Sequence, residues 1–204
     1  MTESANASDE GGRAADKPLD FSHALSSCSP ADAIDGAGFR TGMRALAGAV
    51  TVLTTADGPD RLGLTATAVC SLSADPPRLL ACVNQRGPTF AMMKRTGHLV
   101  VNALAEGQAG IAECFAGLDR SVSDRFQVGE WTAGRYRAAP VLRGAVCSFE
   151  CAISEILNAV SHGLIIADIK AVHVTSNVKP LLYADGAFVR LASDFVDPRH
   201  AFQF

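Results

Sequence analysis

Hydrophobic and small polar residues alternate along one stretch of the chain, Gly63 to Pro77, which reads GLTATAVCSLSADPP. This period of two predicts an extended strand whose small side chains would let a ligand lie against the backbone. The strand is expected to end at Asp75, because the two prolines that follow donate no N–H. A second strand is expected directly afterwards, over the strongly apolar run Arg78 to Asn84. Together the two strands would form a groove edged with hydroxyls and amides that tolerates an anion, although an ordinary half-buried strand and turn also fits.

The remaining pattern predicts more strands and a few short helices around this groove. A helix is expected from Gly38, with Phe39, Met43 and Leu46 on one face and its end at Gly48. Further helices are expected over residues 89–95 and 107–116, and further strands over residues 49–55, 98–104, 140–142, 145–157, 163–174, 181–183 and 188–191. The predicted fold class is therefore mainly β with a few short helices, arranged as a closed or split β-barrel.

Two other segments carry specific expectations. Residues 119–137 are polar, contain the chain's one tryptophan and predict an ordered surface loop. In the strand over residues 145–157, alternation places Cys147, Phe149 and Cys151 toward the core and Ser148 and Glu150 on the opposite face. The six cysteines lack zinc-site spacing, so no metal is expected, and reduced thiols fit a cytosolic chain.

Composition narrows the class of protein without identifying it. The chain has 204 residues, 48% of them hydrophobic, which is enough for one sizeable core. We expect a mobile N-terminal tail over residues 1–37 and one domain over residues 38–204. A net charge of −3 does not indicate a basic surface for binding nucleic acid. No apolar run approaches the roughly 20 residues that span a bilayer. With no secretory signal at the N-terminus, a cytoplasmic protein is expected, with no membrane partner.

The segments taken together resemble the flavin reductase-like domain of the small component of two-component flavin-dependent monooxygenases. The resemblance runs from Phe39 to Leu191, about three-quarters of the chain, and rests on the order and spacing of its pieces rather than on any one of them. The pieces are FRTGMRALAGAVTVLTT, GLTATAVCSLSADPPRLLACVN, GPT, LVVNALA, CFAG, DRF, APVLRGAVCSFEC, SHGLIIADI and PLLYADGAFVRL.

This resemblance implies a split β-barrel, usually a homodimer, that binds FAD or FMN and oxidises NADH or NADPH. Reduced flavin would then leave and supply a partner oxygenase. Residues implied to contact the flavin are Thr51, Val52, Thr65, Ala66, Thr67, Ala68, Ser71, Asn84, Gly87, Pro88 and Thr89. The resemblance places His162 and Tyr183 close to the nicotinamide, as the candidate catalytic residues. Arg125 is a further candidate, as a partner for a flavin or nicotinamide phosphate.

The chain departs from the family pattern at two of these places. The family often has serine where this chain has Gly87, so phosphate binding there would rest on backbone amides, including those at the start of the following helix. It often has an acid before the histidine, where this chain has Ser161, whose hydroxyl could still accept the His162 N–H. Each candidate also has a structural alternative: plain strand residues on the opening stretch, a turn former at Asn84, a surface histidine, a core tyrosine and a solvated arginine.

Hydride transfer between nicotinamide and flavin needs the two rings stacked in a dry site, and the cofactors carry the chemistry. The sequence has no G-x-G-x-x-G after a strand, so a Rossmann site is not expected. The leading hypothesis is an NAD(P)H:flavin oxidoreductase that uses flavin as a diffusing substrate. Two alternatives stay open: a barrel of the pyridoxamine phosphate oxidase-like type that holds its flavin, and a non-catalytic flavin-binding redox protein.

Overall fold

The computed structural model describes residues 34–118, 121 and 124–191. Most of the predicted tail, residues 1–33, lies outside this part of the chain. The chain divides into residues 1–40 and 41–204, and the helix α1 (Gly36–Arg44) crosses that boundary. The predicted end of this helix is wrong: Gly48 begins the short strand β1 (Gly48–Ala49), four residues after α1 ends.

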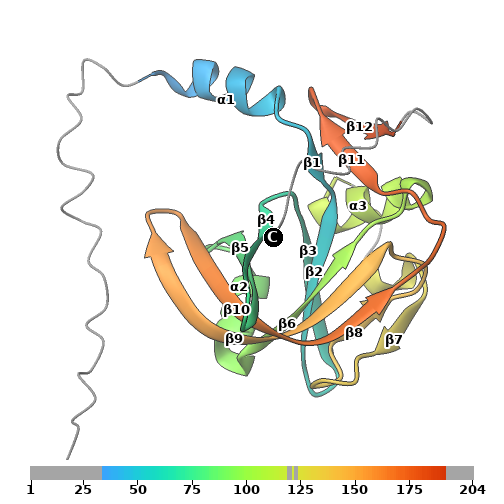
Figure 1. Cartoon of the computed structure of the whole chain (residues 1–204). Coiled ribbons are helices and arrows are strands. Elements are labelled where there is room, and N and C mark those ends of the chain that lie inside the picture. Colours follow the sequence, from blue (N-terminus) through green and yellow to red (C-terminus); the bar gives the residue numbers. More distant parts are fainter. Residues whose placement is uncertain (1–33, 119–120, 122–123, 192–204) are drawn as a thin grey trace, which may run out of the picture. The chain divides into compact units, whose positions relative to one another are not determined.

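Strands dominate the described residues from Thr41 onward, which confirms the predicted fold class (Figure 1). The described residues form a seven-stranded antiparallel sheet in the order β3-β2-β6-β9-β10-β5-β4. Its strands are β2 (Thr51–Asp57), β3 (Asp60–Ala66), β4 (Val69–Ala74), β5 (Pro77–Asn84), β6 (His98–Ala103), β9 (Cys147–Ala159) and β10 (His162–Val174). A second sheet contains β1, β11 (Leu181–Ala184) and β12 (Ala187–Arg190).

The predicted continuous strand over the opening stretch is wrong in one respect, because the chain breaks at Thr67 and Ala68. The Val69 N–H donates to the Thr67 carbonyl at 3.1 Å, which closes a tight turn, and the Cys82 N–H donates to the Ala68 carbonyl at 2.9 Å. The break separates β3 from β4, and these two strands form opposite edges of the sheet. A two-residue link spans at most about 10 Å, so the sheet must curl until its edges approach each other. This is the geometry of a split barrel.

Two helices cover the sheet close to this break. Helix α2 (Pro88–Thr96) begins with proline, whose missing N–H is not needed there, and ends at Gly97 in the left-handed region with φ 69°. It buries Phe90 and Met93 in a core cluster with Leu53 and other apolar residues of the sheet. The second helix, α3 (Ala109–Ala116), follows the 3-10 turn η3 (Glu106–Gln108). No helix in the described part of the chain is long and apolar enough to cross a membrane.

A second core cluster lies around Phe115 of α3. Its ring packs against Phe126 in the 3-10 turn η4 (Arg125–Gln127) and against Trp131, with ring centroids 5.1 and 5.3 Å away. Trp131 begins β7 (Trp131–Ala133), which pairs with β8 (Pro140–Leu142). The predicted strand over residues 140–142 therefore exists, but it belongs to a separate two-stranded sheet in the described residues.

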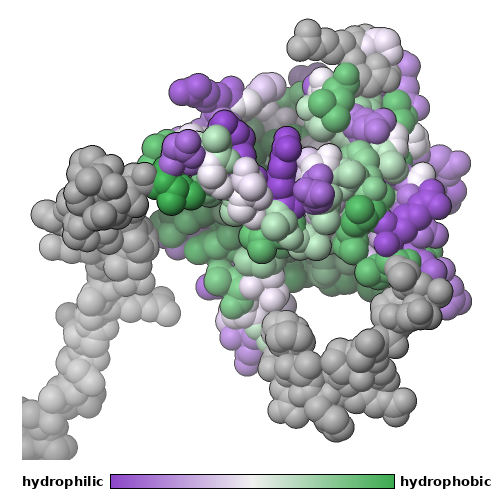
Figure 2. Space-filling model, turned by 90° about the horizontal axis from the view of Figure 1, so that it is seen from above, coloured by the Kyte–Doolittle hydropathy of each residue, from purple (hydrophilic) through white to green (hydrophobic). Residues whose placement is uncertain are grey.

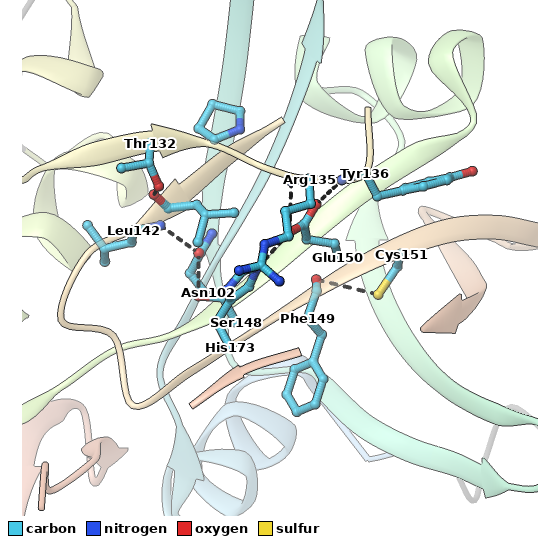
Figure 3. Close-up of polar contacts among 12 residues, drawn as sticks. Asn102, Thr132, Arg135, Tyr136, Leu142, Ser148, Phe149, Glu150, Cys151 and His173 are labelled. Atoms are coloured by element: carbon cyan, nitrogen blue, oxygen red, sulfur yellow. Dashed lines mark hydrogen bonds and ion pairs between the residues drawn. The ribbon is translucent and has the colours of Figure 1, made fainter. Parts of the chain in front are cut away.

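The structure also corrects the predicted orientation of β9, because Ser148 and Glu150 are buried rather than exposed. The segment from β7 to β8 covers the face of β9 that the alternation assigns to solvent (Figure 3). Glu150, with no exposed surface, accepts hydrogen bonds from the Arg135 and Tyr136 amides and from His173 Nε2, the last at 2.6 Å. The Glu150 carboxylate thus fixes the covering segment to the sheet.

The pKa of Glu150 lies below its ordinary value, although burial by itself raises it. The hydrogen bonds from His173 and the two backbone amides favour the charged form and outweigh that desolvation. Because the folded-state pKa is depressed, the carboxylate stabilises the fold above the unfolded-state pKa of 4.5. This contribution is lost as the pH falls from there through the lower folded-state pKa.

We expect Glu150→Gln to lower the free energy of unfolding at pH 7 by about 2 kcal/mol, because the charge-assisted hydrogen bonds are lost. The variant should also lose part of the acid dependence of stability below pH 4.5. Urea denaturation at pH 7 and at a series of acid pH values measures both effects.

Glu155→Gln is the matched control, since Glu155 is an exposed residue of the same strand and its substitution should change stability little. Equal stability of the wild type and Glu150→Gln would contradict the role given to this carboxylate.

Candidate functional site

The break between β3 and β4 opens into a hollow of about 380 Å³. Its walls come from the end of β3, the two link residues, the end of β5, the end of α3 and the start of β10. The lining residues are Leu64, Thr65, Ala66, Thr67, Ala68, Cys82, Val83, Asn84, Phe115, Ala116 and His162. The structure therefore brings together six sequence-predicted residues: Thr65, Ala66, Thr67, Ala68, Asn84 and His162. We call this hollow the ring pocket.

His162 and Asn84 stand opposite each other where β10 and β5 meet. The His162 side chain is exposed, and its Nδ1 lies 2.8 Å from the Ser161 hydroxyl. Asn84 Oδ1 accepts the Arg86 N–H at 2.9 Å and fixes the turn after β5. Gln85 holds the two strand ends together, since its side chain donates to the His162 carbonyl at 2.9 Å. These contacts hold the backbone that carries the His162 imidazole.

A second hollow, of about 290 Å³, adjoins the ring pocket, and Phe115 lines both of them. Its lining residues are Arg61, Leu62, Gly63, Pro88, Thr89, Phe115, Asp124, Arg125 and Phe126. Three of these, Pro88, Thr89 and Arg125, are sequence-predicted site residues. The first turn of α2 borders this hollow, and Gly87 at its N-cap supplies no side-chain cap. We call this hollow the anion pocket.

Charge in the anion pocket favours an anionic ligand. The Arg61 guanidinium lies 4.6 Å above the Phe126 ring and 3.7 Å from the Asp124 carboxylate. Arg125 Nη1 donates to the Phe115 carbonyl at 3.3 Å, which holds one end of that guanidinium. The lining thus contains two guanidiniums and one carboxylate, beside the positive end of the α2 dipole. Arg61 was not predicted from the sequence, because no local motif connects it with α2.

Several predicted hydroxyls are already used within the protein. Thr51 donates to the Ala66 carbonyl at 2.7 Å, and Thr65 donates to the Ala112 carbonyl at 2.7 Å, which ties β3 to α3. Thr89 points its hydroxyl at the Gly63 carbonyl, 3.4 Å away. Thr67, at the break, is exposed. Backbone groups and Thr67 are thus the polar groups that β3 and the link present to a ligand.

Not all predicted site residues lie in these two pockets. Thr51 and Ser71 line a separate, mostly apolar groove of about 650 Å³ beside β4. Val52 has no exposed surface and packs in the core. Tyr183 lies on β11 and packs edge-on against Phe188, outside all three hollows. Gly87 is the N-cap of α2, and an added Cβ there would meet no atom closer than 3.9 Å, so a serine would fit.

The chain is similar to a family of known proteins. The family model described as "Flavin reductase like domain" matches residues 43–192. The chain belongs to this family. It is 40% identical over 158 residues to FMN reductase (NADH) RutF 1 of Methylorubrum extorquens, covering 77% of each chain.

Solved structures of flavin reductases share the fold. The Streptomyces globisporus NADH:FAD oxidoreductase SgcE6, solved with NAD and FAD fragments, matches with a TM-score of 0.73 and 28% identity, over 78% of this chain and 94% of that one. BorF, the flavin reductase component of a bacterial two-component tryptophan halogenase, matches with a TM-score of 0.71 and 27% identity, over 78% and 100%. The predicted resemblance to flavin reductase components is thereby confirmed.

The absence of a side chain at Gly63 sets the position of Phe115 between the two pockets. A Cβ at Gly63 would lie 2.7 Å from the Phe115 ring, which is buried and packs against Phe126 and Trp131. We expect Gly63→Ala to lower the free energy of unfolding by about 1–3 kcal/mol through this overlap. Chemical denaturation measures the loss.

Gly42→Ala is the control, because an added Cβ there meets no atom within 4 Å and alanine favours a helix. If Gly63→Ala were as stable as the wild type, the ring would not be held as tightly as the packing indicates.

Proposed function

We propose that this protein is an NADH-dependent flavin reductase, with the flavin ring in the ring pocket and the flavin phosphate in the anion pocket. One observation carries the proposal: a neutral hollow and a cationic hollow adjoin at Phe115 and match the two ends of a flavin nucleotide. The first is lined by small residues and backbone, and the second by guanidiniums and the start of a helix.

Within this proposal, each pocket has a defined task. Small residues from Thr65 to Ala68 let a flat ring approach the backbone. Arg61, Arg125 and the first amides of α2 bind the phosphate. The ring of Phe115 forms the floor where the two pockets meet. His162 stands at the open side of the ring pocket, where it would orient an incoming nicotinamide.

When both cofactors are bound, the nicotinamide supplies a hydride to the flavin ring, and the protein needs to align the two and exclude water. His162 would align the nicotinamide, since its Nδ1 pairs with the Ser161 hydroxyl and leaves Nε2 for the ligand. Tyr183 packs against Phe188 rather than lining the ring pocket, so we assign the nicotinamide contact to His162 alone within this chain.

We further propose FMN as the preferred flavin and NADH as the reductant. The relative with 40% identity is named an FMN reductase (NADH). FAD is the alternative flavin, because the structurally similar SgcE6 is named an NADH:FAD oxidoreductase. NADPH remains the alternative reductant, although no arginine cluster in the described residues is placed for a 2′-phosphate near His162.

A partner oxygenase and a homodimer complete the proposal. BorF acts as one component of a two-component halogenase, and reduced flavin made here would likewise serve a separate oxygenase in the cytoplasm. The 650 Å³ apolar groove supports pairing with a second copy, since it lies beside the edge strand β4, where Leu72 is 47% exposed. Figure 2 shows hydrophobic residues at the surface among hydrophilic ones on the face that it presents.

The test of the activity is NADH consumption by the purified protein with FMN, with FAD and with no added flavin. We expect saturable consumption that requires added flavin, with a lower KM for FMN than for FAD. A protein that stays yellow through dialysis and oxidises another substrate would favour the pyridoxamine phosphate oxidase-like alternative. No NADH consumption with either flavin would contradict the proposed function.

We expect His162→Ala to slow flavin reduction by NADH about tenfold, while the Kd for FMN changes less than twofold, because His162 aligns the nicotinamide and not the flavin. Stopped-flow absorbance measures reduction, and quenching of flavin fluorescence measures binding. Ser161→Ala is the graded control: it keeps the imidazole but removes its partner, so its effect should be smaller. Equal reduction rates in His162→Ala and wild type would overturn the assignment.

A further inference from the structure

A polar cavity of about 260 Å³ lies at the C-terminal end of α2, at the other end of the helix from the anion pocket. Its chemistry comes from Asp57, Arg95, Thr96, His98 and Arg137. A nine-residue helix rises about 13 Å, so this cavity is well separated from the first turn of α2. None of these residues belongs to the site proposed for the flavin.

His98 provides the first sign that this cavity takes a ligand. The side chain is 5% exposed, and its Nδ1 lies 3.2 Å from the Thr96 carbonyl. Since a carbonyl only accepts, Nδ1 carries the hydrogen and Nε2 is the free position of the neutral ring. Nε2 is the one buried side-chain nitrogen or oxygen of the described residues that has no hydrogen-bond partner. Leaving such an atom unpaired is unfavourable. Nε2 is itself shielded from solvent, so a ligand in the cavity would pair with it after a small shift of the ring or its neighbours, and that pairing would relieve the cost.

Arg137 provides the second sign. It adopts φ 62° and Ala138 adopts φ 53°, a left-handed conformation that side chains disfavour. The fold holds this turn from both sides, because Glu150 binds the Arg135 and Tyr136 amides and Gly134 donates to the Ala139 carbonyl at 2.9 Å. The fixed turn keeps Arg137 at the cavity despite the strain.

The cavity carries a net positive charge. Arg95 pairs with Asp57, with both its Nε and an Nη atom 3.0 Å from Oδ2. The carboxylate therefore balances one guanidinium, and Arg137 supplies a second that no carboxylate of the described residues pairs with. The C-terminal end of α2 contributes some negative potential, which the Arg137 guanidinium has to outweigh.

We propose that this cavity is a second, separate binding site for a phosphate-class oxyanion. Arg137 and Arg95 donate to the anionic oxygens, and a protonated oxygen of hydrogen phosphate or of a phosphomonoester donates to His98 Nε2. Free phosphate and a nucleotide phosphate share this chemistry. The inference is independent of the flavin reductase proposal, because it uses no residue of the ring or anion pocket.

The test follows the His98 imidazole nitrogens by long-range 1H–15N NMR during titration with sodium phosphate at constant pH and ionic strength. We expect a saturable shift of the Nε2 resonance, assigned with His98→Asn, that equivalent sodium chloride does not produce. Arg137→Gln should weaken the apparent affinity at least tenfold. Arg135→Gln is the matched control from the same turn, since its exposed side chain does not line the cavity, and its affinity should stay within twofold of wild type.

Two further arms locate the phosphate and identify its source. Arg61→Ala removes a guanidinium from the anion pocket and should leave the His98 titration unchanged, which separates the two sites. The same titration is repeated with AMP in place of phosphate. Tighter binding of AMP than of phosphate would indicate that the site takes a nucleotide phosphate, and binding that is no tighter would indicate free phosphate. An Nε2 resonance that fails to move with either probe, or equal loss of affinity in Arg137→Gln and Arg135→Gln, would overturn the proposal.

Discussion

The structure depends on one connection, the two-residue link between β3 and β4. These strands are consecutive in the chain but occupy opposite edges of the seven-stranded sheet. Because two residues span so short a distance, the edges must come together, and the sheet curls around its own core. The edges meet without pairing, since β3 pairs with β2 and β4 pairs with β5. The ring pocket and the apolar groove both lie along the seam that results.

The functional arrangement follows from this seam. On one side lies the ring pocket, with the link residues Thr67 and Ala68 in its wall, and on the other side lies the apolar groove beside β4. Phe115 is held between the ring pocket and the anion pocket by the Thr65 hydrogen bond to α3 and by the missing side chain at Gly63. A single backbone break thus places a neutral surface, a cationic surface and an exposed apolar strand within one region.

The sequence allowed most of the strands, both covering helices and six residues of the ring pocket to be predicted, because alternation and family spacing are local signals. It did not allow β7 to be predicted, because this strand lies within the polar segment 119–137 that was interpreted as a surface loop. It did not allow the break at Thr67 to be predicted, since a tight turn between small residues leaves the alternation of Leu64 to Ser73 intact. Nor did it place Glu150, whose partners at Arg135 and His173 are distant in the chain. Alternation assigns a carboxylate to solvent unless another segment covers it. The sign in the sequence that this carboxylate is buried was its position as a single acid within the mostly apolar run Cys147 to Ile153.

The same limit explains the pocket residues that were missed. Arg61 lines one pocket together with the first turn of α2, and His98 lines another together with Arg137. Both depend on contacts between distant segments, which one sequence does not reveal. Val52 and Tyr183 were predicted as site residues from their family positions. In the structure, Val52 is buried in the core and Tyr183 packs against Phe188.

A crystal structure of the protein with bound FMN would show where the flavin lies. We expect the flavin ring against residues 65–68 beside His162, with the phosphate between Arg61 and the first turn of α2. A ring found in the apolar groove beyond β4, or a phosphate bound away from α2, would contradict it.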